Sequence, residues 1–172
     1  MKKGISIILS IVLVLSMSAS AFASEAPLND NTIYVDTITP REARFSIDDI
    51  QEAAFSGEEY FSLYTSHYFP FDDTPYNSMT SDFIEYEVQQ GEEVRIEVIS
   101  CSWYPHTCNL EIGILNLDNG YDYSGSVGGG NYTGTLIFGD MDAARYMVFV
   151  RNTSAATITD GSIRYSITSG QP

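Results

Sequence analysis

Apolar and polar residues alternate at every second position along much of the chain. The segments 83–88 and 94–98 both place apolar side chains on one face and charged side chains on the other, with a glycine-containing turn at 89–92 between them. A period of two is the repeat of a β-strand with one buried face and one solvated face. The pattern predicts a hairpin of two such strands joined by this turn.

Further strands are predicted before and after this pair. They cover residues 33–38, 60–69, 110–114, 133–138, 145–151 and 162–167. The segment 145–151 is apolar on both faces, so we expect it to be a central strand. One short helix is expected near 47–56, with an irregular crossing as the alternative. Short strands separated by turn residues at intervals of about ten residues indicate an all-β fold, an antiparallel β-sandwich of jelly-roll type.

The amino terminus has the three regions of a secretory signal. Two lysines precede an apolar run over residues 5–15, and Ala21-Phe22-Ala23 supplies the small residues of a cleavage site. We expect residues 1–23 to be removed during secretion, residues 24–32 to form a mobile leader and residues 33–172 to form one domain. The alternative, an uncleaved anchor, is disfavoured because a membrane-spanning helix needs roughly 20 apolar residues.

The chain that remains after cleavage is strongly acidic. Both lysines lie in the signal, so six arginines face 23 carboxylates, a net charge of −17. This charge repels nucleic-acid phosphates and anionic lipid head groups, which argues against nucleic acid and the membrane surface as partners. Solubility outside the cell explains the charge, with attraction of calcium or a basic partner as the alternative. The 21 aromatic residues after the signal predict a folded core rather than disorder.

The order of patterns from residue 83 to residue 167 is similar to that of pre-peptidase carboxy-terminal domains, small jelly-roll sandwiches of exported bacterial proteins. The matching segments are Phe83–Val88, Val94–Val98, Leu110–Ile114 with the Asn/Asp/Gly loop after it, Gly134–Phe138 and Ala144–Asn152. Such domains usually have a glycine-bearing turn where this chain has Ala143-Ala144. The resemblance implies an accessory or binding role, with no catalytic residues to transfer.

Cys101 and Cys108 are the only cysteines, with six residues between them. In an oxidising compartment this pair is most simply a disulfide. Closing so short a loop is expected to add about 2.5 kcal/mol of stability. The alternative is a metal site of these two cysteines with His106. That site lacks an evident fourth ligand, because His67 is the only other histidine.

Five aromatic residues are candidates for ligand binding. They are Trp103, Tyr104, Tyr121, Tyr123 and Tyr132, which lie among Asn and Asp residues in segments expected to be loops. Exposed rings stack on the apolar faces of sugars, while carboxylates and amides bind the hydroxyl groups. The alternative is that these rings cover the ends of the core with one edge in water.

Four aspartates near turns, Asp118, Asp122, Asp140 and Asp142, offer oxygen ligands for calcium. They do not fit an EF-hand loop, because the twelfth position counted from Asp118 is Gly129 rather than Glu. Turn formation by Asp and Asn explains these residues without a metal. We expect no cofactor, and calcium is the single exception that these residues leave open.

No catalytic motif is present, since the sequence contains neither Gly-x-Ser-x-Gly nor His-Glu-x-x-His. Some pair among 23 carboxylates will reach the spacing of a glycosidase by chance. The sequence therefore predicts a secreted, extracellular, non-catalytic binding or surface-interaction module whose ligand is a glycan or another protein. The alternatives are a secreted carbohydrate-acting hydrolase and a structural or protein-recognition protein.

Overall fold

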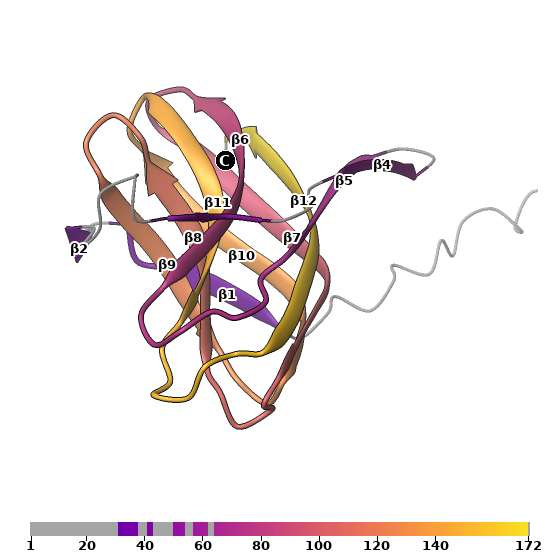
Figure 1. Ribbon diagram of the computed structural model, residues 1–172. Helices are drawn as coiled ribbons and strands as arrows, with labels where there is room; N and C mark the ends of the chain where they lie inside the picture. The colour runs from indigo at the N-terminus through magenta and orange to yellow at the C-terminus, as the bar shows by residue number, and fades with distance from the viewer. Residues whose placement is uncertain (1–30, 38–40, 43–49, 54–56, 62–63, 172) are drawn as a thin grey trace, which may run out of the picture.

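The chain folds as a sandwich of two six-stranded sheets, seen in a computed structural model (Figure 1). The structure describes residues 31–37, 41–42, 50–53, 57–61 and 64–171, with the backbone alone at 41–42, 58–61 and 64. The strands are β1 (Thr32–Val35), β2 (Arg41–Glu42), β3 (Gln51–Glu52), β4 (Gly57–Phe61), β5 (Tyr64–Pro70), β6 (Met79–Val88), β7 (Glu92–Tyr104), β8 (Leu110–Asn116), β9 (Tyr121–Val127), β10 (Asn131–Met141), β11 (Ala144–Asn152) and β12 (Asp160–Gly170). The all-β sandwich predicted from the sequence is confirmed.

Sheet A has the strand order β1-β10-β7-β12-β5-β4, and sheet B has the order β2-β9-β8-β11-β6-β3. Both sheets are mixed, because β1 runs parallel to β10 and β3 runs parallel to β6, while the other pairs are antiparallel. As predicted, β11 is a central strand, lying between β8 and β6. Within the described ranges no helix is long and apolar enough to cross a membrane.

The predicted hairpin of residues 83–88 and 94–98 is wrong. Strand β6 belongs to sheet B and β7 belongs to sheet A, so the turn between them joins the two sheets. Gly91, with φ of 77°, makes this corner, and its N–H donates to the carbonyl of Met141 over 2.8 Å. Alternation specifies which face of a strand is buried, but it does not specify the partner strand.

Three local predictions also need correction. In the predicted helix near 47–56, Gln51 and Glu52 form β3, whose backbone bonds to β6 in place of helical bonds, and most of the remaining range lies outside the described residues. The predicted strand 60–69 is split between β4 and β5, which pair with each other. Strand β1 begins at Thr32, inside the predicted leader. The predicted signal at 1–23 and the first part of that leader lie outside the described residues.

The core has two clusters, one on each face of sheet B. On β11, Tyr146, Val148 and Val150 belong to the larger cluster between the sheets. Alternate residues, Met147 and Phe149, belong to a smaller cluster on the opposite face. Side chains of a strand point to its two faces in turn, so both faces of β11 are buried. The outer cluster also contains Ile50, Met79 and Leu115.

One extra residue in β7 changes which of its residues face the core. Ser100 pairs with Arg164 and Val98 pairs with the next residue, Tyr165, so Ile99 has no partner on β12. The register with β10 shifts at the same place. Ile99 is accordingly 42% exposed. This β-bulge reverses the inward and outward positions of the residues that follow it.

Gly113 on β8 is closely surrounded by its neighbours in sheet B, so there is no room for a side chain at this position. A Cβ at this position would lie 2.7 Å from the Cβ of Ser124 and 2.8 Å from Cζ of Phe149, and closer still to the carbonyl oxygen of Tyr123. The backbone oxygen cannot move aside as a flexible side chain can. The missing side chain therefore leaves room for the Phe149 ring, whose residue pairs with Gly113 on the neighbouring strand.

We expect Gly113→Ala to lower the free energy of unfolding by about 2 kcal/mol, because the added methyl overpacks a closed site. Gly139→Ala is the matched control, since a Cβ there would meet no atom within 4 Å. Urea unfolding of both variants measures the difference. Equal midpoints would show that the sheet tolerates a side chain at Gly113.

Candidate functional site

The bulge at Ile99 places Trp103 inside the sandwich and Tyr104 outside it. Trp103 is 2% exposed, and its indole N–H donates to the carbonyl of Cys108 over 2.8 Å. The sequence-based candidate Trp103 is therefore a core residue and offers no surface for a ligand. Tyr104, the next residue, is 58% exposed and is the one candidate ring that stands well out in solvent.

His106 supports the Tyr104 ring from one side. The two rings meet edge to face, with centroids 5.6 Å apart and an angle of 86° between their planes. His106 Nδ1 lies 2.8 Å from the carbonyl oxygen of Trp103. A carbonyl can only accept a hydrogen bond, so Nδ1 is the donor. The hydrogen bond to the Trp103 backbone thus orients the imidazole, and the imidazole packs against one side of the Tyr104 ring.

Polar side chains surround Tyr104 on the outward face of sheet A. Asp160 lies directly opposite Tyr104 on β12, and both residues are exposed. The next outward row consists of Asn131, Ser102 and Ser162, which are register partners on β10, β7 and β12. Directly opposed residues of this kind have Cβ atoms about 4.5–5.5 Å apart. We call these five residues the Tyr104 platform.

The other three aromatic candidates do not join this platform. Tyr123 on β9 is 5% exposed and belongs to the core. Tyr121 lies on the same strand in sheet B and is half-buried. Tyr132 points inward opposite Cys101, its hydroxyl donates to the carbonyl of Asn31 over 2.7 Å, and burial raises its pKa. With Trp103 counted, three of the five candidate rings, Trp103, Tyr123 and Tyr132, lie in the core or pack against it, as in the alternative considered from the sequence.

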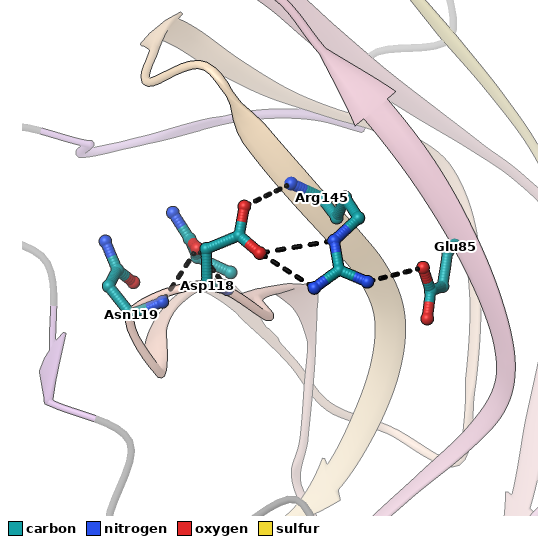
Figure 2. Close-up of polar contacts among 5 residues, drawn as sticks. Glu85, Asp118, Asn119 and Arg145 are labelled. Carbon is teal, nitrogen blue, oxygen red and sulfur yellow. Dashed lines mark hydrogen bonds and ion pairs between the residues drawn. The ribbon is translucent and has the colours of Figure 1, made fainter.

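Asp118, a calcium candidate, is bound to an arginine (Figure 2). Arg145 donates from Nη2 to Oδ1 of Asp118 over 2.9 Å and from Nη1 to Glu85 over 3.1 Å. These contacts lower the pKa of Asp118. Asn116 stabilises the turn itself, because its Oδ1 accepts from the backbone N–H groups of Asp118 and Asn119. The turn hydrogen bonds expected of Asn and Asp are therefore present at this loop.

Asp122, a second calcium candidate, is buried in an ion triad on the outer face of sheet B. Arg151 donates to Glu111 and, over 2.9 Å, to Oδ2 of Asp122. Asp140 and Asp142 are exposed near the β10–β11 turn, apart from this triad. Within the described residues no group of three or more metal-binding side chains occurs. The four aspartates are therefore divided among separate places.

A buried polar network between the sheets was missed by the sequence analysis. Tyr165 donates its hydroxyl proton to Oδ2 of Asp82 over 2.7 Å, and its oxygen lies 3.0 Å from the hydroxyl of Tyr86. The ring of buried His67 lies 5.3 Å from that of Tyr165. Burial raises the pKa of Asp82, opposed by the hydrogen bonds from Tyr165 and the N–H of Ile84 and by His67. The signal in the sequence was an aspartate within a continuous β-forming stretch.

Asp82 should contribute more to the stability of the folded protein at mildly acidic pH than at neutral pH. Because its pKa is raised, the folded state binds the Asp82 proton more tightly than the unfolded state does. This stabilisation is present below the ordinary pKa of a carboxyl group and is lost as pH rises through the folded-state pKa. We expect the unfolding free energy of Asp82→Asn, relative to that of the parent, to rise from about pH 4 towards neutrality. Urea unfolding across this range tests it, and a constant difference would contradict it.

The predicted disulfide is not formed in the structure, where Cys101 and Cys108 are both free and buried. Cys101 faces inward on β7, and burial raises its pKa to about 12. Cys108 lies beyond the end of the strand, with its thiol directed at the carbonyl of Ala156, 3.7 Å away. The strand continues through Tyr104, so the two cysteines do not close the short loop that their spacing indicated. A metal site with His106 is likewise not assembled, since His106 bonds to Trp103.

We expect both thiols to be unreactive in the folded protein, because they are buried and the Cys101 thiolate is strongly disfavoured. Titration with a chromogenic disulfide reagent should detect no thiol in buffer and both thiols in denaturant. If no thiol is detected in denaturant, without added oxidant, the two cysteines are instead joined in the disulfide predicted from the sequence.

No family model matches the sequence, and no curated protein matches it. Among solved structures, the CBM22-1 xylan-binding domain of Xyn10C from Paenibacillus barcinonensis is similar, with a TM-score of 0.40 and 9% sequence identity. The match covers 81% of this chain and 98% of that domain. The sandwich implied by the resemblance to pre-peptidase carboxy-terminal domains is confirmed by the strand order, whereas no family model supports the resemblance itself.

Proposed function

We propose that the protein is an exported, non-catalytic binding module that holds a carbohydrate on the Tyr104 platform. The observation that carries this proposal is the exposed and laterally supported ring of Tyr104 beside a carboxylate and a row of hydroxyl and amide groups. A sugar ring presents one apolar face and a rim of hydroxyls, which is the complement of this surface. The platform lies on three paired strands, β10, β7 and β12, so binding a ligand requires little ordering of the protein.

The buried carboxylates Glu111 and Asp122 are poor candidates for a catalytic pair. A glycosidase uses two carboxyl groups that face the same substrate, one as an acid and the other as a base or nucleophile. Glu111 and Asp122, the carboxylates of the ion triad, both accept hydrogen bonds from Arg151 and have side-chain exposures of only 8% and 1%. They are occupied by a structural contact and closed to a polysaccharide.

We expect Tyr104→Ala to weaken binding to immobilised glycans about tenfold, the loss associated with one aromatic contact. Tyr34→Ala is the matched control, because Tyr34 is 78% exposed but lies on β1. A glycan array identifies the ligand and titration calorimetry measures the affinity. Reducing-sugar release is followed in the same samples.

Two results would contradict the proposed function. Release of reducing sugar that a single carboxylate substitution abolishes would identify a hydrolase. Equal loss of binding in Tyr104→Ala and Tyr34→Ala would place the contact elsewhere or mark it as unspecific.

A further inference from the structure

The pairing of Tyr104 with Asp160 combines an aromatic face and a carboxylate at one spot. The two residues are directly opposed on β7 and β12 and point to the same side of sheet A. Thr159 N–H donates to the carbonyl of Tyr104 over 3.0 Å, which fixes the strands at this end of the pair. A ring face and a carboxylate at this spacing both attract a cation, the ring through its quadrupole and the carboxylate through its charge.

The local charges favour the same kind of ligand. Within the described part of the chain the Asp160 carboxylate has no ion-pair or hydrogen-bond partner of its own. Asp72 adds a second negative charge beside it, because its Oδ1 accepts from the N–H of Gly161 over 3.0 Å. Arg164, the described cation on the same face of β12, is four residues away, about 14 Å along an extended strand, and is engaged in an interaction of its own.

We propose that the Tyr104 platform selects glycans that carry protonated amino groups. The inference rests on the proposed function and specifies its ligand class. The ammonium group lies between the Tyr104 ring and the Asp160 carboxylate, and neighbouring sugar hydroxyls bind the Ser102, Ser162 and Asn131 row. Acidic glycans are repelled, and neutral glycans retain the stacking and hydroxyl contacts but gain nothing from the Asp160 charge.

The test compares three oligosaccharides of equal length at about pH 6, where an aspartate is ionised. They are glucosamine oligomers, their N-acetylated counterparts and glucose oligomers. Exposed cation–π contacts and exposed ion pairs are individually weak, so we expect the amino oligomers to bind about five- to tenfold more tightly than the other two. Asp160→Asn should remove this preference without weakening the binding of neutral oligomers, and added salt should reduce it.

Asp140→Asn is the matched control, because Asp140 is an exposed aspartate whose φ of 51° an asparagine also adopts. It removes one negative charge far along β10 and should leave the preference unchanged. Loss of the preference in both variants would assign it to net charge and overturn the inference.

The remaining outcomes separate the inference from the proposed function. Equal affinity for amino and N-acetylated oligomers, with both lost in Tyr104→Ala, would overturn the inference and leave the glycan-binding function standing. Binding of a lysine-rich peptide with no binding of any oligosaccharide would overturn both, since the platform would then recognise a protein. Preference for the amino oligomers that survives in Asp160→Asn would place the cation site elsewhere.

Discussion

The exposed site depends on a single extra residue in the central strand of sheet A. Strand β7 lies between β10 and β12, and both neighbours shift register where Ile99 is inserted. Before the bulge, even-numbered residues such as Val98 face the core, and after it odd-numbered residues such as Trp103 do. If this same sequence paired regularly through Ile99, without a bulge, the two-residue period would direct Trp103 outward and Tyr104 inward. The bulge therefore selects which aromatic residue stabilises the core and which one reaches solvent.

This dependence explains which parts of the structure the sequence predicted. The strands with regular alternation or with two apolar faces, such as 110–114 and 145–151, were predicted because each pattern is local. The partner of β7 was not predicted correctly. A turn with the composition of residues 89–92 can either close a hairpin or connect two different sheets. The position of Trp103 was mistaken for the same physical reason. Cys101 to Cys108 contains turn residues, so it was interpreted as a loop, whereas backbone pairing with β12 carries the strand through Tyr104.

The candidate site was correspondingly predicted only in part. Tyr104 was among the chosen rings, but Asp160 was not among the chosen carboxylates, because their pairing joins residues 56 positions apart. The selected aspartates at 118 and 122 have arginine partners instead. No local pattern distinguishes an aspartate that an arginine neutralises from one that stays free. That distinction requires the strand register.

The positions of the arginines determine where negative charge remains exposed on the surface. Arg95, Arg145 and Arg151 each pair with carboxylates, and one of these contacts is fully inside the structure. Burying a guanidinium between two carboxylates is favourable only when its hydrogen bonds are made, as they are on the outer face of sheet B. Since these cations are held by their own neighbours, they do not screen carboxylates elsewhere, and the excess negative charge remains on the exposed rows.

That excess charge and the rigidity of the paired strands act together on a ligand. A long-range negative field raises the local concentration of cations at every part of the surface, so by itself it selects no site. The Tyr104 ring supplies the missing selectivity, because it adds a contact of fixed orientation at one place in that field. Its supports, the His106 imidazole and the β7–β12 pairing, are already formed in the free protein. The affinity of such a site then depends on the short-range contacts of one sugar unit, while the surrounding carboxylates determine the sign of the charge it accepts.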